Sequence, residues 1–180
     1  MTKRRDILRK VLVICLLALP AVTMIAQDFY DEFRAKSIDV EGVKTGQKMT
    51  YDQFVTKFGK PTEYIQSDSD SGEEGTPTTD EYYRVGKDVF YFRNNGNFCG
   101  FSIKDKKLSV LTLWIDGGIH VGDKLSSLDN FKYGKPKVAS WLEPKDGVVK
   151  YTLFYNYLYG LVFLSLKDGT ICSISYSDTI

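Results

Sequence analysis

A segment with the start and stop signals of a short helix occurs twice in this chain. The first copy runs from Gly46 to Pro61, and the second begins 76 positions later, is one residue shorter, and runs from Gly122 to Pro136. Each copy leads into residues typical of strands. A pattern repeated at a fixed distance is typical of duplicated architecture, so it constrains the fold more than any other feature of the sequence.

The first copy predicts a helix of about two turns that ends at Phe58. Thr50 and Gln53 have the spacing of a capping box, in which each side chain accepts a hydrogen bond from the other residue's backbone N–H. Gly59 suits the position just past a helix end, and Pro61 cannot continue the helix. So short a helix is unstable alone, so we expect it to be held by packing on the strands that follow.

The second copy predicts a corresponding helix over residues 126–133. Asp129 stands where the first copy has Gln53, so the reciprocal bond of the capping box is missing and we expect a weaker cap. Gly134 and Pro136 repeat the exit signals of the first copy.

Strands are predicted after each helix, where aromatic and β-branched residues concentrate. They cover residues 81–85, 89–93, 97–104 and 108–115, and then 137–143, 148–156, 160–167 and 170–176. Consecutive hairpins without long crossover helices predict an α+β fold. We expect two tandem repeats of a short helix plus an antiparallel β-meander, with the helices on one face of a curved sheet and the other face open.

The domain organisation follows from these boundaries. Residues 1–26, with a basic start and an apolar run from Val11 to Ile25, predict a signal peptide cleaved after Ala26, and hence export to a periplasmic or extracellular location. Met24 is large for the third position before the cut, which leaves an uncleaved anchor open. Residues 27–44 would form a helix and connector, 45–116 the first repeat, and 117–180 the second.

The stretch 67–80 is polar and acidic, which predicts a solvated loop inserted into the first repeat. Counted as a calcium loop from Asp68, it has Gly72 where an oxygen ligand belongs, Glu73 in place of the glycine, and Thr79 in place of the bidentate acid. The match fails, so no metal site is predicted here.

The net charge of the mature chain narrows the classes of partner. Removing residues 1–26 takes away five of 24 basic and one of 23 acidic residues, leaving 19 against 22 and a net charge of −3. This balance predicts no nucleic-acid partner, and the mature chain carries no predicted membrane span.

Cys99 and Cys172 can form a bridge between the repeats or remain as two small buried residues, and we favour the second.

No catalytic set, cofactor motif or metal-ligand spacing is recognisable in the sequence. His120 is the one histidine, and in a linker between repeats it is expected to be a polar surface residue. The chain is therefore predicted not to be an enzyme and to need no cofactor. A hydrolase that uses carboxylates stays open as a more distant alternative.

Tyrosines concentrate near the end of the second repeat and form the predicted partner-binding site. The candidate residues are Tyr151, Tyr155, Tyr157, Tyr159 and Trp141. Tyrosine and tryptophan are frequent anchors of recognition surfaces because they offer rigid area with a polar tip. Either the tyrosines line one face of an extended strand or they crown a hairpin tip. The alternative is that these rings pack within the sheet, since aromatic residues favour strands.

The repeated Gly-x-Lys-Met/Leu-Thr/Ser start, the short helix and the Phe/Tyr-Gly-Lys-Pro exit resemble the tandem repeat of the beta-lactamase inhibitor protein (BLIP) family, and the single unit is similar to the BamE/SmpA outer-membrane lipoproteins. The resemblance covers most of residues 45–177 and implies a curved sheet whose concave face grips a protein. The chain departs from BLIP in its disulfides, in its second helix and in the acidic insertion.

From these features we predict an exported, non-enzymatic module that binds an unidentified protein or peptide through an aromatic-rich open sheet face. The alternative that the BamE/SmpA resemblance implies is a component of cell-envelope or outer-membrane assembly.

Overall fold

The structure, a computed structural model, describes residues 37–69, 78–93, 95–132, 134–156 and 160–177, all within the compact unit Ser37–Ile180. For 67–69, 78–80, 155–156, 160–161 and 177 it describes the backbone alone. The elements are β1 Asp39–Val40, β2 Val43–Lys44, α2 Tyr51–Phe58, β3 Glu63–Ser69, β4 Thr78–Val85, β5 Asp88–Arg93, β6 Phe98–Ile103, the 3₁₀ helix Leu125–Leu128, β7 Lys137–Val138, β8 Val148–Asn156, β9 Gly160–Lys167 and β10 Thr170–Ser177.

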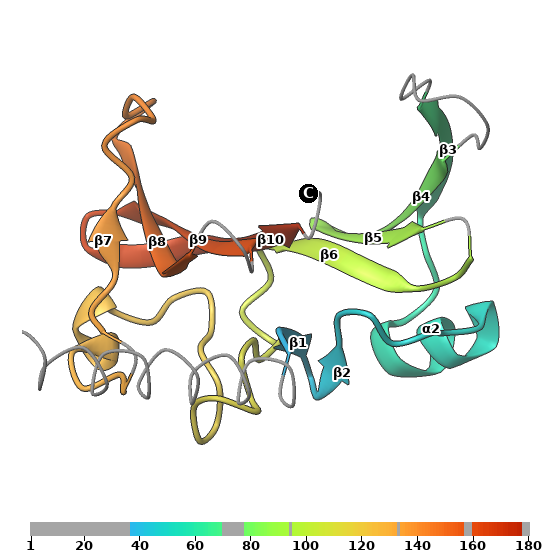
Figure 1. Cartoon of the computed structure of the whole chain (residues 1–180), viewed down its shortest axis with the longest axis horizontal. Helices are drawn as coiled ribbons and strands as arrows, with labels where there is room; N and C mark the ends of the chain where they lie inside the picture. The colour runs from blue at the N-terminus through green and yellow to red at the C-terminus, as the bar shows by residue number, and fades with distance from the viewer. Residues whose placement is uncertain (1–36, 70–77, 94, 133, 157–159, 178–180) are drawn as a thin grey trace, which may run out of the picture. The chain divides into compact units, whose positions relative to one another are not determined.

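Eight of the described strands form a single sheet in the order β3-β4-β5-β6-β10-β9-β8-β7 (Figure 1). Every neighbouring pair in it is antiparallel. Consecutive strands pair as hairpins at both ends, and the two groups meet where β6 pairs with β10. The strands β1 and β2 form a separate two-stranded hairpin.

The helix α2 forms as its sequence signals predict. Gln53 N donates to Thr50 Oγ1 over 3.3 Å, and Thr50 N donates to Gln53 Oε1 over 2.9 Å, so the capping box is confirmed. Gly59 ends the helix with a φ of 95°, in the region that favours glycine. Phe54 and Phe58 are both buried, and Phe54 lies with its ring centroid 4.8 Å from that of Tyr83 and 5.2 Å from that of Phe90. Packing on the sheet therefore holds a helix too short to be stable alone.

The prediction of two helix-plus-meander repeats is wrong. Among the described residues α2 is the one α-helix, and the strands of both halves join into one continuous antiparallel sheet, which makes the structure mainly β. The second expected helix, over 126–133, is a 3₁₀ helix of 4 residues, Leu125–Leu128. Its N-cap, Lys124, has no side-chain capping bond, and Ser127 N bonds to the carbonyl of Lys124 in the tighter 3₁₀ pattern. The missing capping box explains why an α-helix does not start here.

Two predicted strands differ from the structure. Residues 108–115 form an irregular segment, because Leu111 takes a φ of +61° and the carbonyl of Leu111 accepts bonds from Trp114 and Ile115 N–H groups in a turn. The strand expected over 137–143 is limited to β7, since a bond from Leu142 N to Ala139 O turns the chain after it. The strands over 148–156 and 160–167 are confirmed with the predicted bounds.

The acidic stretch 67–80 is less of a loop than predicted. Its two ends, 67–69 and 78–80, extend β3 and β4 as paired strands. Residues 70–77 lie outside the described part of the chain, as do the predicted signal peptide 1–26 and, up to residue 36, the helix expected at the start of 27–44. Within the described residues no helix is long and apolar enough to cross a membrane.

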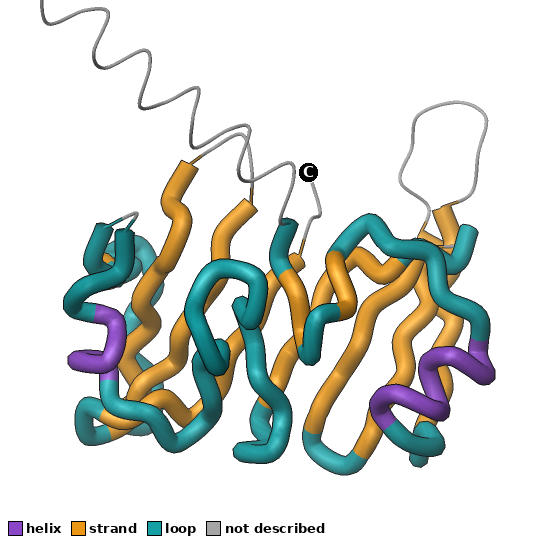
Figure 2. The backbone as a smooth tube through the Cα atoms, turned by 90° about the horizontal axis from the view of Figure 1, so that it is seen from below, coloured by secondary structure: helices purple, strands orange, loops and turns teal. Residues whose placement is uncertain are grey.

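The core lies between the sheet and a layer of loops and short helices on one of its faces. Figure 2, seen from below, shows α2, the 3₁₀ helix and the intervening loops in front of the strands. The residues that point toward this layer form a cross-strand row given by the register: Tyr64, Tyr83, Phe90, Phe101, Tyr176, Val162 and Leu153. We call this side the covered face.

One buried carboxylate joins the covering layer together. Asp39 is fully buried, and its Oδ2 accepts from Gly42 N, Thr112 N and Thr112 Oγ1, while its Oδ1 accepts from Leu113 N. The β1–β2 hairpin is thereby tied to the turn that begins at Leu111, 72 residues further along the sequence. In a strand, the backbone N–H groups of Thr112 and Leu113 would bond to a neighbouring strand. Here they bond to this carboxylate instead.

Candidate functional site

The second face of the sheet is the candidate functional site. Its cross-strand row, given by the register, runs Glu63, Arg84, Val89, Ser102, Ser175, Phe163, Thr152 and Lys137. With strands about 4.8 Å apart, the row crosses roughly 34 Å of sheet. None of the described elements packs over it (Figure 1). We call this side the uncovered face.

The β3–β5 end of the uncovered face combines two tyrosines with an ion pair. The rings of Tyr82 and Tyr91 meet edge to face with their centroids 6.2 Å apart. Arg84 Nε and Glu63 Oε2 lie 2.6 Å apart beside them. Burial raises the pKa of Tyr91, and the neighbouring Tyr82 adds to the rise, while Arg84 opposes it. This end therefore presents two half-buried tyrosines, and the raised pKa favours the neutral form of Tyr91.

The centre of the uncovered face is lined by small hydroxyl side chains. Ser102 lies opposite Ser175, and Ser173 lies opposite Ser165 on the neighbouring strand. Ser165 is only 7% exposed, and no hydrogen bond joins its hydroxyl to another residue in the described part of the chain. An unpartnered buried hydroxyl is uncommon, because its desolvation is then uncompensated.

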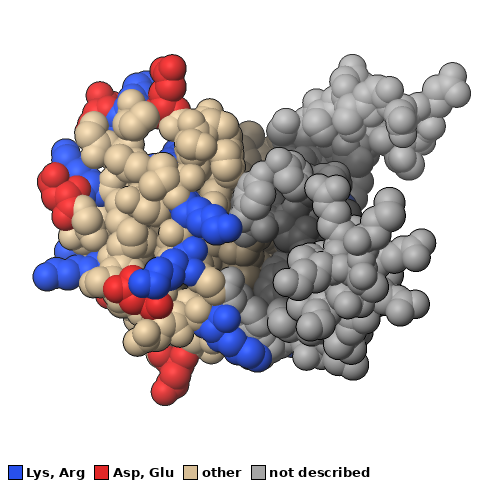
Figure 3. Space-filling view, turned by 60° about the vertical axis from the view of Figure 1, so that its left-hand side comes forward, with Lys and Arg blue, Asp and Glu red and all other residues tan. Residues whose placement is uncertain are grey.

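The β7–β9 end of the uncovered face is basic. Lys137, Lys150 and Lys167 alternate along their strands with covered-face residues, so all three belong to the uncovered face. Lys150 Nζ lies 6.0 Å from the centroid of the Phe163 ring, a distance at which a cation interacts with the ring face. Figure 3, which brings this end forward, shows Lys and Arg side chains projecting from the surface among several Asp and Glu side chains.

The predicted site residues are only partly described. Trp141 is 53% exposed in the loop after β7, as a recognition residue would be. Tyr151 is half-buried and lies opposite Leu164 on the covered side of the sheet, so it does not belong to the uncovered face. Tyr157 and Tyr159 fall outside the described residues, as does the side chain of Tyr155. The structure therefore does not place Tyr151 on the uncovered face.

Most rings of the β3–β6 strands pack on the covered face. Phe90, Phe92, Phe98 and Phe101 are buried there, while Tyr82, Tyr91 and Phe163 stay on the uncovered face. Aromatic content could not show this division, since it depends on which side the helix packs. One signal was present in the sequence: in 88–93, phenylalanine and other residues alternate, which is typical of a strand with one buried face.

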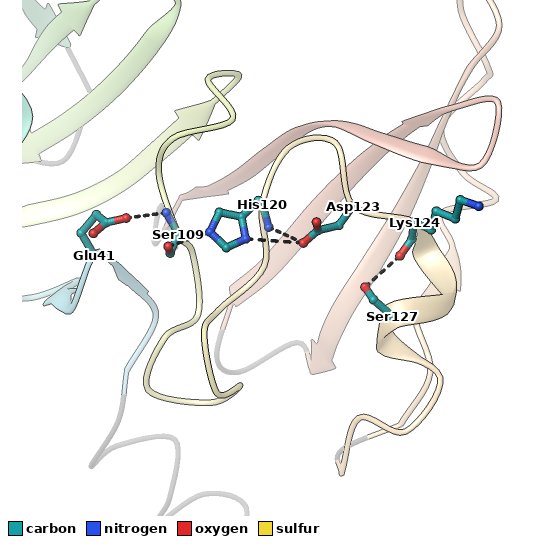
Figure 4. A network of polar contacts seen from close by, with 6 residues as sticks. All are labelled: Glu41, Ser109, His120, Asp123, Lys124 and Ser127. Atoms are coloured by element: carbon teal, nitrogen blue, oxygen red, sulfur yellow. Dashed lines mark hydrogen bonds and ion pairs between the residues drawn. The ribbon is translucent and has the colours of Figure 1, made fainter.

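A second polar cluster, which the sequence interpretation missed, surrounds His120. Ser109 Oγ and His120 Nε2 lie 2.8 Å apart, and His120 Nδ1 lies 3.6 Å from Asp123 Oδ2 (Figure 4). The isolated pairing of Val110 with Ile119 brings the two segments together. His120 is thus hydrogen-bonded, and the expectation of a plain surface histidine was incomplete.

The order serine, histidine, aspartate invites comparison with a catalytic triad. The distance from Nδ1 to Asp123 is too long for a hydrogen bond, and the same carboxylate oxygen accepts from the backbone N of His120 at 2.8 Å. The backbone N of Ser109 donates to Glu41 Oε1 at 2.6 Å, so it is not available to an oxyanion, and the carboxylate beside it would repel one. The cluster is best suited to holding the β1–β2 turn, residue 109 and the loop 120–123 together.

Metal and thiol chemistry have little support in the described residues. No group of three or more His, Cys, Asp or Glu side chains there is placed to hold a metal ion. Cys99 and Cys172 form no disulfide, so the preference for two unbridged residues is confirmed. Cys99 is buried as expected, whereas Cys172 is partly exposed and donates to the carbonyl of Ser165.

No family model, no curated protein and no solved structure matches the chain. The resemblance to the BLIP and BamE/SmpA families therefore stays a prediction.

Proposed function

We propose that this protein is an exported, non-enzymatic module that holds a protein or peptide partner on the uncovered face of its sheet. The observation that carries the proposal is the one-sided covering of the sheet: loops and short helices lie on one side, where five of the seven residues in the row are buried, and no described helix or strand packs over the opposite row. A broad sheet face of mixed apolar, hydroxyl and charged character is the usual make-up of a non-obligate protein interface.

The composition of this face refines the predicted one. It is less aromatic than expected, because most rings pack toward the covering layer. Tyr82, Tyr91 and Phe163 remain as candidate anchors, and they are separated by the hydroxyl-lined centre. In this proposal the rings supply apolar contact area and the hydroxyls supply adaptable hydrogen bonds.

The proposal favours binding over catalysis for a specific reason. Among the described residues, the arrangement that approaches a catalytic set lies at His120, and there the serine N–H is bound to Glu41 and the aspartate is too distant from the ring. The same contacts are accounted for by a role in holding loops of the covering layer.

Capture with a blocked face tests the proposal. The full chain and its Ser175→Arg variant are immobilised, and proteins retained from the exported fraction are identified by mass spectrometry. Ser175 lies at the centre of the uncovered face, so arginine there should abolish retention of the specific partner. Ser126→Arg, at an exposed position in the 3₁₀ helix, serves as a charge-matched control and should retain it.

The result against the proposal is equally clear. If Ser175→Arg and Ser126→Arg retain the same proteins as the unchanged chain, the uncovered face does not hold the partner. Circular dichroism of both variants confirms that the sheet is intact. Alanine at Tyr155 and Tyr157 tests separately whether the predicted tyrosine cluster contributes.

A further inference from the structure

We infer that the β7–β9 end of the uncovered face binds an extended acidic segment of the partner, with carboxylates at alternate positions. This inference rests on the proposed function and names the chemistry that the site selects. It is carried by the placement of three lysines, by the lack of acids beside them, and by a buried hydroxyl without a described partner.

The three lysines lie on one straight diagonal across three strands. Lys137 on β7 is opposite Thr152, and Lys150 on β8 is two residues before that position. Lys167 on β9 is opposite Val148, two residues further in the same direction. Each consecutive pair is therefore a diagonal neighbour, about 7–8 Å apart at the backbone. We call this set the lysine diagonal.

An extended peptide matches this spacing. Side chains two residues apart on one face of an extended chain are separated by about 6.8 Å, close to the step of the lysine diagonal. A peptide with acids at every second position can therefore place three consecutive carboxylates against the three ammonium groups. All three lysines are exposed, so a ligand can reach them.

The charge of this end is unlike that of the chain as a whole. Residues 27–180 carry a net charge of −3, yet the described side chains on the uncovered face of β7–β10 include the three lysines and no acid. Asp146 and Asp168 are nearby, but they occupy the turns at the strand ends. A patch of three lysines with no acid beside them on the same face is complementary to a short acidic segment.

The Ser165 hydroxyl gives a second reason to expect a ligand here. Ser165 lies directly opposite Lys150, at the middle of the lysine diagonal. It is 7% exposed, and within the described residues its hydroxyl has no hydrogen-bond partner. A carboxylate held by Lys150 could accept a bond from this hydroxyl, which would offset its desolvation.

A peptide suits the face better than a nucleic acid. Single-stranded nucleic acids need open ring faces on which bases stack. Lys150 lies over the Phe163 ring, and the rings of Tyr82 and Tyr91 meet edge to face. A long polyanion would also extend past the three lysines, whereas a short acidic segment interacts mainly with the charge within a Debye length of about 8 Å.

Fluorescence anisotropy with defined probes tests the inference. The probes are a 12-residue labelled peptide alternating Glu and Thr, the same peptide with Gln in place of Glu, and a 12-nucleotide single-stranded DNA. The full chain should bind the Glu peptide at least about tenfold more tightly than the Gln peptide, with an affinity that falls as salt is raised. It should bind the DNA more weakly than the Glu peptide.

Matched variants locate the binding. The triple change Lys137→Gln, Lys150→Gln and Lys167→Gln should weaken binding of the Glu peptide about tenfold or more. A control triple removes the same charge from exposed positions in or beside α2, at Lys48, Lys57 and Lys60, and should stay within about twofold of the unchanged chain. Ser165→Ala should weaken the Glu peptide and leave the Gln peptide unchanged.

Several outcomes overturn the inference. If both triple variants lose the same binding of the Glu peptide, the effect is one of net charge. If the DNA binds more tightly than the Glu peptide, the face is assigned to nucleic acid. If the Glu and Gln peptides bind equally, the face has no preference for acids. If the Glu and Gln peptides bind equally and Ser175→Arg loses binding of both, the acidic preference fails but the proposed binding face is still supported. If no peptide binds, the acidic-segment inference fails alone, and capture with Ser175→Arg still decides the proposed function.

Discussion

Asp39→Asn is the sharpest test of how the covering layer is held on the sheet. The carboxylate is fully buried and accepts four hydrogen bonds, three of them at Oδ2 and one, from Leu113 N, at Oδ1. Asparagine offers one acceptor and one amide group. Its best orientation keeps the oxygen at the Oδ2 position and turns the amide against Leu113 N–H, so that one buried donor meets another.

The size of the effect follows from these contacts. Leaving the Leu113 N–H unpaired costs about 1–3 kcal/mol. The three remaining bonds lose their charge assistance, which makes such bonds about twice as strong as neutral ones. Against this, a neutral amide is easier to bury than a carboxylate. We expect a net loss of about 2 kcal/mol in the free energy of unfolding.

Urea unfolding followed by tryptophan fluorescence measures this loss. With a slope of about 2 kcal/mol per molar urea, the midpoint of Asp39→Asn should fall by about 1 M. Asp116→Asn, in an exposed turn, removes the same charge and should leave the midpoint unchanged. A midpoint for Asp39→Asn within about 0.2 M of the unchanged chain would refute the reasoning, because the carboxylate would then not hold the layer.

Three further predictions concern the helix, the core and the uncovered face. Thr50→Ala removes one half of the capping box and should lower the free energy of unfolding by about 1 kcal/mol. Thr56→Ala, at an exposed position of the same helix, should not destabilise the chain. Equal effects of the two changes would contradict the capping role. Phe54→Leu should lower the free energy of unfolding by about 1–2 kcal/mol, because it loses edge-to-face contacts with Phe90 and Phe92. A decrease of less than about 0.5 kcal/mol would show that these ring pairs contribute little. The pKa of Tyr91 is raised in the folded chain by burial, so its contribution to stability is present below the unfolded tyrosine pKa of about 10 and is lost as pH rises through the folded value. Urea unfolding from pH 9 to pH 11 should therefore show a smaller alkaline loss of stability for Tyr91→Phe than for the unchanged chain, and identical pH profiles would contradict it.

Local signals in the sequence predicted the parts of the fold that depend on near neighbours. The bounds of α2 follow from Thr50, Gln53 and Gly59, whose contacts all lie within four residues along the chain. The strands over 148–156 and 160–167 follow from their branched and aromatic residues, and Asp168 and Gly169, which suit a tight turn, join β9 to β10.

The candidate site was only partly predictable. An open sheet face was expected, but the sequence could not say which side chains would occupy it, because a single-residue change in register reverses the two faces. The tyrosine pattern pointed to Tyr151, which lies toward the covered side. The net charge of the chain gave no indication of the lysine diagonal. The cluster at His120 escaped notice because Glu41, Ser109 and Asp123 come from three separate segments.

By itself, the sequence determined where the one described α-helix begins and ends and where most strands and turns lie, because caps, turn residues and strand propensity act over a few positions. Only the tertiary structure decided that both meanders join through β6 and β10 into one sheet, and that residues 108–115 form a turn on the carboxylate of Asp39 instead of a strand. It also decided which face is left uncovered. The physical reason is that these outcomes depend on pairings between residues some 70 positions apart, and such pairings are selected by the burial of one face of the whole sheet, not by any local pattern.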